Sequence, residues 1–482
     1  MELQYRGTGR VYFKEKENKC DLYYNEKEGG ILLKIIVQNE GKLGGYFEIP
    51  LEMPFLCGQL ENGFKFTLLH LVRTGMNDLL SYGRTEYTFS VEYLLCGIGG
   101  EKLQDQTFHT VDFFLSNILE WGGQTVYEIG KRYELVHKDG KVRKMIFSCP
   151  DYDINYSVVG SMLPVCELDL LRDHIELEQH GIISVEFKGE RKFDNFIEVF
   201  SKLKRLIEIA VLDRVNIERI VAYSSSIQFS VGDITVEQSI EVIGKTIKKE
   251  AEDGLNSQRW KWFDLSELIS NHAIEHYFSK YEKLAPIIEL FLEPLYIEMG
   301  SNTHIFLNII QALETYHSRF VTNDIKEFTA RVEQLSKKLA NNCEEVKKFL
   351  IANSSRFITL ESRLADLLLA DGNRYIFDTG KFQWTDFPSV LAHSRHYYIH
   401  YDEGIKEEFR VLSEEELQIY NRTLLKMLEY YLLLELGFSN STELQKKLYS
   451  RWGNVSRELE IYEISKKHSS ETKDNASIMR GD

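Results

Sequence analysis

The sequence predicts an α+β protein: a β-rich N-terminal domain, sandwich or barrel-like with at least one helix, followed by an all-α helical bundle. Residues 1 to about 245 break into short apolar or alternating runs bounded by turn residues, which is typical of strands. From about residue 255, apolar residues recur instead at helical spacing. The 482 residues can bury two substantial cores. We expect a β-rich domain over 1–250, a helical domain over 260–455 and a polar tail over 466–482.

The first half contains a series of short strand candidates, which favour a sandwich or barrel-like sheet over a parallel α/β fold. They are Gly9–Phe13, Cys20–Tyr24, Ile31–Val37, Phe64–Leu71, Thr85–Leu95 and Phe108–Leu115. One amphipathic helix interrupts them over about 193–211, where Phe196, Phe200 and Leu203 recur at helical spacing.

Two hairpins are expected in the same half. One joins Tyr133–His137 to Val142–Cys149 through an Asp-Gly turn, a strong hairpin signal. The other joins Ile175–Glu178 to Ile182–Phe187 and turns at Gly181, because glycine is favoured where a turn needs positive φ.

The second half carries the signals of a helical bundle. Apolar stripes predict helices over about 305–320, 324–340, 343–352, 358–370 and 386–402. Ser413 followed by Glu416 is a capping box that predicts the start of a strongly apolar helix. Gly437 is a natural residue to end that helix, and a last helix is expected over about 442–452.

Charge and motif content exclude several classes of protein. A net charge of −16 argues against a protein that coats nucleic acid through bulk positive charge, although it allows a small basic site. The six cysteines form no Cys-x2-Cys pair, so a zinc ribbon is not expected, and their wide spacing predicts reduced, mostly buried thiols. The sequence has no NTPase Gly-x4-Gly-Lys-[Ser/Thr] loop and no Gly-x-Ser-x-Gly nucleophile elbow.

The sequence shows no signal for secretion or membrane insertion. The start, MELQYRGTGRVYF, lacks a basic segment followed by an apolar run, so no signal peptide is predicted. The most apolar stretch of the second half, Tyr430–Leu436, is too short to cross a bilayer. We expect a cytoplasmic protein without a membrane partner.

The main candidate for chemistry is the Arg-x4-His pattern from Arg395 to His400, inside the predicted helix 386–402. A guanidinium can grip a phosphate, and an imidazole can move a proton near neutral pH. On an ideal helix Arg395, His396 and His400 lie away from the packing face, which is formed by Val390, Leu391, Ser394, Tyr398 and Tyr401.

Three interpretations of this helix remain open from the residues alone. The histidines can be ordinary surface residues beside an ion-paired arginine. His393, His396 and His400 can instead form a metal-binding stripe, although no nearby Cys or His-Glu-x2-His pattern completes a zinc site. In the third interpretation the pair cuts RNA. Arg395 and His400 lie about 140° apart on an ideal helix, so they converge only through the long arginine side chain, an unwound helix end, or a two-fold with another chain.

Four stretches of the second half fit, in order and spacing, a single known domain. They are Ala312–His317, Arg363–Leu368, Arg395–Tyr401 and Leu432–Gly437. Over residues 262–452 the chain resembles a HEPN domain, and more narrowly the C-terminal HEPN domain of ApeA-type abortive-infection proteins. Active members carry Arg-x4-6-His, usually with a polar residue after the arginine, here His396. The first half is similar to the ApeA N-terminal domain in length and pattern, including Gly58-Gln59-Leu60 before Phe64–Leu69.

The resemblance implies a metal-independent endoribonuclease that needs no cofactor and acts as a homodimer whose two motifs face each other. His400 would then be the general base for a ribose 2′-hydroxyl or the acid for the 5′-oxygen. Arg395 would hold the scissile phosphate, and His396 would help to orient it. The products would carry 2′,3′-cyclic phosphate and 5′-hydroxyl ends, and DNA would resist because it lacks the 2′-hydroxyl.

The resemblance also implies antiphage defence by self-inflicted RNA damage, with tRNA cut in the anticodon loop. The N-terminal domain is then a candidate sensor of a phage trigger and a brake on the nuclease. Glu314 and His317 are expected to contact the Arg395 helix, and Tyr397 and Tyr401 to pack rather than stack on bases. Two alternatives stay open: a catalytically inactive HEPN dimerisation or RNA-binding module, and a metal hydrolase with histidine ligands.

Overall fold

The computed structural model divides into two compact units, Met1–Ser266 and Glu267–Asp482, which are described separately. The residues described are 6–13, 16–25, 30–38, 49–79, 83–99, 106–131, 135–137, 142–160, 177–231, 234–244, 261–297, 300–338, 357–369, 386–439, 441–455, 457–459, 461–462 and 465. The predicted helix over 343–352 and the predicted tail over 466–482 lie outside these residues.

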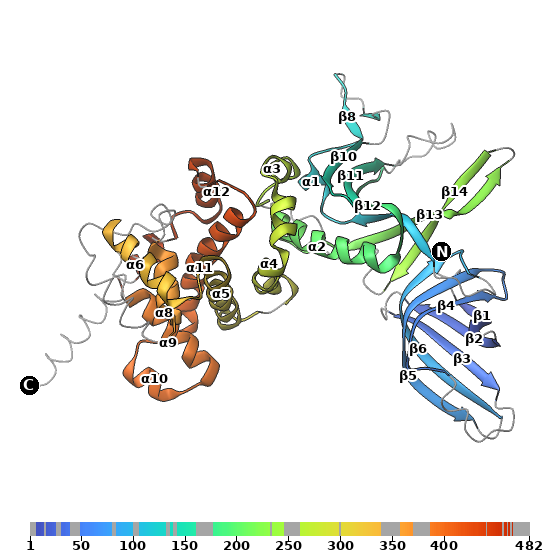
Figure 1. Cartoon of the computed structure of the whole chain (residues 1–482), viewed down its shortest axis with the longest axis horizontal. Helices are drawn as coiled ribbons and strands as arrows, with labels where there is room; N and C mark the ends of the chain where they lie inside the picture. The colour runs from blue at the N-terminus through green and yellow to red at the C-terminus, as the bar shows by residue number, and fades with distance from the viewer. Residues whose placement is uncertain are drawn as a thin grey trace, which may run out of the picture. The chain divides into compact units, whose positions relative to one another are not determined.

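Antiparallel strands dominate the first unit (Figure 1). They are β1 Gly7–Phe13, β2 Lys16–Asn25, β3 Gly30–Gln38, β4 Glu52–Leu60, β5 Lys65–Leu79, β6 Arg84–Cys96, β7 Thr107–Leu115, β8 Tyr127–Ile129, β9 Leu135–His137, β10 Val142–Ser148, β11 Tyr152–Gly160, β12 Gln179–Lys192, β13 Ile217–Val231 and β14 Ile234–Gly244. Twelve of the strands described form one sheet, and β8 pairs with β9 in a small second sheet.

Six of the strands close into a barrel. The order β6-β3-β2-β1-β4-β5 returns to its start because β5 also pairs with β6. Alternate residues face the interior: on β3, Ile31, Leu33 and Ile35 are fully buried, whereas Leu32 is exposed. Gly58 on β4 allows the close approach of its neighbours, since a Cβ there would lie 2.6 Å from the carbonyl oxygen of Arg10. The predicted barrel-like β fold is therefore confirmed.

The other six strands, in the order β10-β11-β12-β7-β13-β14, continue the sheet from β6 through the β14–β6 pairing. Helix α2, Phe193–Val211, packs on β7 and β12. Its Phe200 stacks on Phe113 with ring centroids 3.8 Å apart, and its Phe196 meets Phe187 at 4.8 Å. The predicted helix over 193–211 is thus confirmed, and its apolar face covers the sheet.

Both predicted hairpins are wrong. Strand β9 pairs with β8, and β10 pairs with β11, so the segments on either side of the Asp-Gly dipeptide do not pair with each other. Gly181 does not turn the chain, because β12 runs straight through it. A Cβ at Gly181 would lie 2.5 Å from the Ile118 side chain. This glycine therefore serves close packing rather than a turn.

The second unit is helical in the residues described. Its helices are α3 Leu265–Ser270, which starts in the last residues of the first unit, α4 Ala273–Tyr296, α5 Asn302–Tyr316, α6 Ile325–Lys338, α8 Leu360–Leu369, α9 Asp386–His400, α10 Glu403–Glu408, α11 Glu414–Glu435 and α12 Thr442–Trp452, with a π-helical turn at His317–Val321. The capping box is confirmed, since Ser413 and Glu416 bond to each other's backbone N–H. Gly437 follows the end of α11 with φ 90°, as predicted.

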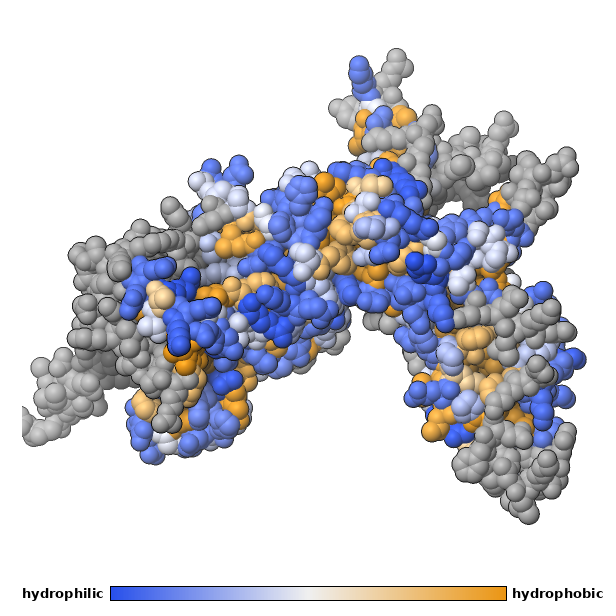
Figure 2. Space-filling view, viewed as in Figure 1, coloured by the Kyte–Doolittle hydropathy of each residue, from blue (hydrophilic) through white to orange (hydrophobic). Residues whose placement is uncertain are grey.

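Three further features concern the surface, the helices and the thiols of the described residues. On the face drawn in Figure 2, hydrophilic residues predominate over the helical unit, with smaller hydrophobic patches between them. Among the described helices, none combines the length and the apolar character needed to span a bilayer. The four cysteines in the described segments are free, and Cys20, Cys57 and Cys96 are buried.

Candidate active site on helix α9

Helix α9 is fixed to the segment before α11 by two hydrogen bonds to one residue. The buried Ser394 hydroxyl accepts the backbone N–H of Leu412 at 2.9 Å, and the Tyr398 hydroxyl donates to the Leu412 carbonyl at 2.7 Å. Leu391 and Val390 are buried on the same side of the helix. These contacts determine which face of α9 stays open.

The three predicted site residues lie on the open side of α9. His396 and His400 are exposed, and their ring centroids are 4.8 Å apart. The Arg395 side chain is 38% exposed, and its guanidinium lies 3.8 Å from the Glu314 carboxylate of α5. The expected contact between Glu314 and the Arg395 helix is therefore present. The pair is loose and partly solvated, so its contribution to folding is small.

The end of α9 differs from the expectation. The helix stops at His400, and Tyr401 adopts φ 52°, a left-handed conformation that turns the chain. Tyr401 is 64% exposed and does not share the packing face. Tyr397 is buried instead; its hydroxyl donates to Glu403 at 3.0 Å, and the Lys406 ammonium lies over its ring.

Arg395 and His400 do not meet within one chain. In the residues described around α9, no hydrogen bond or ring contact joins them: Arg395 is paired with Glu314, and His400 lies against His396. Five residues of helix turn the two side chains apart, as the periodicity predicts. A site that uses both groups on one phosphate needs a rearrangement or a second copy of the chain.

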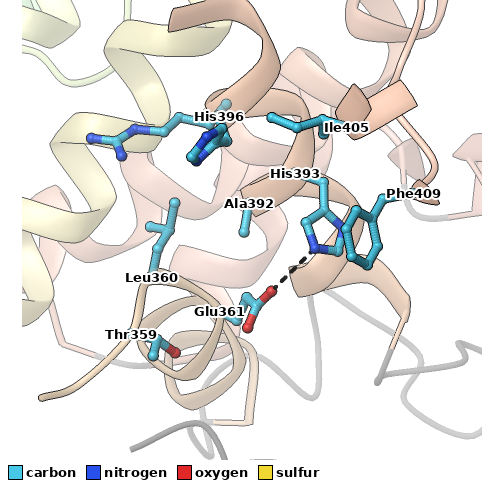
Figure 3. Close-up of a pocket in the computed structure, with 9 residues that line it drawn as sticks. Thr359, Leu360, Glu361, Ala392, His393, His396, Ile405 and Phe409 are labelled. Atoms are coloured by element: carbon cyan, nitrogen blue, oxygen red, sulfur yellow. Dashed lines mark ion pairs between the residues drawn. The ribbon is translucent and has the colours of Figure 1, made fainter. Parts of the chain in front are cut away.

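A pocket of about 320 Å³ opens beside Arg395 and His396 (Figure 3). Its lining comes from the start of α8, from α9 and from the α10 region: Thr359, Leu360, Glu361, Ala392, His393, Arg395, His396, Ile405 and Phe409. His393 points toward Glu361 and Phe409, with its Nε2 3.8 Å from the Glu361 carboxylate and its ring stacked on Phe409.

The histidine stripe does not assemble a metal site in the part of the chain that the structure describes, where no three His, Cys, Asp or Glu side chains are grouped to hold an ion. Burial, followed by the proximity of His396, lowers the pKa of His393. The His393 ring is therefore neutral near pH 7, and its contact with Glu361 is weaker than a full ion pair.

His317 lies in the helical core, where the side-chain contacts that the structure gives it in the described residues are to α6 and α8 rather than to the Arg395 helix. Its Nε2–H donates to Asp366 of α8 at 2.8 Å, and its Nδ1 accepts from Arg363 at 3.0 Å. A ring that accepts at one nitrogen is neutral, and burial accordingly lowers the pKa of His317. Asp366 also accepts from Arg331 at 2.8 Å. This cluster ties α8, which lines the pocket, to the π-helical turn after α5.

These features define a two-part α+β protein whose helical unit carries an arginine and two histidines on the open face of one helix. Residues 5–280 match the model of ApeA N-terminal domain 1, and residues 307–442 match the model of the Apea-like HEPN domain. The chain belongs to the ApeA family, with an ApeA N-terminal domain followed by a HEPN domain. The resemblance and the α+β fold class inferred from the sequence are confirmed. The comparisons with curated proteins and with solved structures found no significant match.

HEPN domains are generally related to ribonucleases, and their combination with an ApeA N-terminal domain suggests an abortive-infection effector of nuclease type. All four stretches that carried the resemblance lie inside the HEPN match. Glu361 and Phe409, which line the pocket next to the motif, were not predicted from the sequence. Neither belongs to a recognisable pattern, and only the fold brings them to His393.

Proposed function

We propose that this protein is an antiphage abortive-infection effector whose HEPN unit is a metal-independent endoribonuclease, with the anticodon loop of tRNA as its substrate. The observation that carries the proposal is that the open side of α9, inside the HEPN match, presents Arg395 beside Glu314 and exposes the neighbouring rings of His396 and His400. A partly exposed guanidinium beside two exposed imidazoles supplies a phosphate ligand and proton carriers.

The proposed reaction is an internal transfer on the phosphate. His400 acts as the base that takes the proton of a ribose 2′-hydroxyl, or as the acid that protonates the leaving oxygen. The bond from the 2′-oxygen to phosphorus forms, the bond to the 5′-oxygen breaks, and the 5′-oxygen gains a proton. Arg395 stabilises the charge that develops on the phosphate, and His396 helps to orient it. The ends produced are a 2′,3′-cyclic phosphate and a 5′-hydroxyl.

The separation of Arg395 from His400 within one chain supports a homodimer as the active form. In a symmetric dimer the same surface of both copies meets at the axis. The open face of α9, with the exposed Ile399 and Tyr401 at its end, is a surface that a second copy can cover. Arg395 of one copy then lies opposite His400 of the other, and both groups reach one phosphate.

The N-terminal unit is proposed as the sensor of a phage trigger and as a brake on the nuclease. The proposal rests on the two-part layout and on the need to keep such an enzyme inactive before infection. Inducible expression of residues 255–482 tests it against the full chain. Greater toxicity of the fragment, lost on His400→Ala, supports a brake, whereas toxicity equal to that of the full chain contradicts it.

A catalytically inactive dimerisation or RNA-binding module is the alternative, which the engagement of Arg395 by Glu314 favours. Purified full-length protein incubated with bulk tRNA separates the two functions. The ribonuclease leaves 5′-hydroxyl and 2′,3′-cyclic phosphate ends in anticodon loops, and it leaves a tRNA with 2′-deoxyribose at the cut nucleotide intact. Binding of tRNA without cleavage favours the inactive module, and cleavage of the deoxy-substituted position rules out the 2′-hydroxyl route.

A further inference from the structure

The residues that line the pocket beside Arg395 suit one planar ligand with polar groups along its edge. Its volume of about 320 Å³ is at the small end of ligand pockets, which span roughly 300–1,000 Å³. Leu360, Ala392 and Ile405 give it an apolar lining, while Arg395 and His396 of α9 add polar groups to the same lining. A ligand in this pocket therefore adjoins the proposed phosphate site.

Two aromatic rings form one side of the pocket. His393 and Phe409 are stacked with centroids 4.1 Å apart and an interplanar angle of 27°. Because the pKa of His393 is lowered by burial, the pair presents two neutral rings near pH 7. Neutral aromatic faces are the platform on which unpaired bases stack in single-stranded RNA recognition.

Glu361 supplies the polar contact. Its side chain is 20% exposed, and in the described residues its one ionic contact is the 3.8 Å approach to His393. Burial raises the pKa of Glu361, as expected for a carboxyl group short of donors. A ligand with N–H groups on its edge would give this carboxylate hydrogen bonds, of which it has none within the described segments.

We propose that this pocket binds the base of the unpaired nucleotide next to the phosphate held by Arg395, and that guanine is preferred. This inference rests on the ribonuclease function proposed above and names its specificity site. The base stacks on the His393–Phe409 pair and turns its hydrogen-bonding edge to Glu361. Guanine fits best because its N1–H and 2-amino group donate in parallel to the two oxygens of one carboxylate. Adenine and cytosine offer only an amino group, and uracil a single N–H.

The test uses full-length protein and four fluorescently labelled 2′-O-methyl trinucleotides, UGU, UAU, UCU and UUU, which bind but cannot be cut. Fluorescence anisotropy gives the dissociation constant of each. The wild type is expected to bind UGU about tenfold more tightly than the others, the discrimination typical of a bidentate contact to a base. Glu361→Gln removes this preference, and Phe409→Leu weakens all four probes. Glu407→Gln, the same charge change at an exposed position of α10, retains the preference.

Equal binding of the four probes by the wild type overturns the proposal. An unchanged preference in Glu361→Gln, with folding checked by circular dichroism, also overturns it. The experiments distinguish failure of the guanine pocket from failure of the proposed ribonuclease function. A guanine preference that depends on Glu361 in a protein that does not cut tRNA supports the pocket and contradicts the nuclease. Cleavage of tRNA without any preference among the probes supports the nuclease and contradicts the pocket.

Discussion

The guanidinium of Arg395 on α9 lies 3.8 Å from the carboxylate of Glu314 on α5, and both side chains are about one-third exposed. The same carboxylate acts on a second arginine, since Glu314 opposes the lowering of the Arg363 pKa that burial causes. A phosphate that binds Arg395 must therefore compete with Glu314. Glu314 therefore links the electrostatics of the buried Arg363 to those of Arg395 at the proposed site.

Removing the Glu314 charge is expected to strengthen RNA binding. Glu314→Gln should lower the dissociation constant for a 2′-O-methyl RNA by about two- to fivefold, the value of a partly exposed ion pair. Fluorescence anisotropy at low salt measures this dissociation constant. Glu443→Gln makes the same charge change on α12 and is the control for net charge. Weaker binding by Glu314→Gln would mean that the pair holds Arg395 in place and does not compete with phosphate.

Two inactive variants are expected to rescue each other if the site is shared between chains. In a mixed dimer of Arg395→Ala and His400→Ala, one of the two composite sites keeps both groups. Co-expression should therefore restore about a quarter of wild-type cleavage, because half of the dimers are mixed and each has one intact site. Chains co-expressed in equal amounts and purified without selecting for mixed dimers provide the sample. Activity no higher than that of either variant alone would place Arg395 and His400 of one chain in the same site.

Asp366 is expected to be essential to the helical core. Its carboxylate is fully buried and accepts hydrogen bonds from both His317 and Arg331. Asp366→Ala leaves these donors without their acceptor and should lower the free energy of unfolding by about 2–4 kcal/mol. Urea denaturation measures the loss. Glu415→Ala, at an exposed position of α11, should change it by no more than about 0.5 kcal/mol, and equal effects of the two variants would contradict the assignment.

The buried Lys426 is expected to make the free energy of unfolding rise at alkaline pH. Burial lowers its pKa to about 8 from 10.5, although its ammonium donates to the Gly453 carbonyl. Between these values the unfolded chain holds the proton and the folded chain releases it, so stability rises with pH from about 8 to 10.5. Lys426→Met should therefore raise the thermal midpoint at pH 7 and lose this advantage toward pH 10. The exposed Lys446→Met is the control, and a pH-independent gain would contradict the prediction.

Short sequence patterns were sufficient to predict individual helices and strands. Features that depend on contacts between distant segments could not be predicted from them. The capping box at Ser413 and the apolar face of the helix over 193–211 are complete within one turn or one helix, so the sequence was sufficient. Gly181 was misinterpreted because a turn and a close approach to Ile118 both require glycine. Nothing in the sequence indicates that Tyr401 adopts φ 52° and ends α9.

The candidate site also contains residues that the sequence pattern identifies and residues that only the structure reveals. Arg395, His396 and His400 could be found by spacing and resemblance, and helical periodicity placed them on the open face of α9. The pocket could not be found, because Glu361, His393 and Phe409 come from three separate segments. The hydrogen-bond partners of His317 were also beyond prediction, since both of them, Arg363 and Asp366, lie on α8.

The decisive measurement for the roles of Arg395 and His400 is cleavage of bulk tRNA in EDTA by the wild type, Arg395→Ala and His400→Ala. The controls are Arg422→Ala and His304→Ala, which remove the same side chains from α11 and α5. We expect the wild type and both controls to cut tRNA in EDTA and to leave 5′-hydroxyl ends, whereas the two site variants lose at least about 100-fold in rate. Cleavage that requires a metal ion, or that survives both site substitutions, would contradict the assignment of Arg395 and His400.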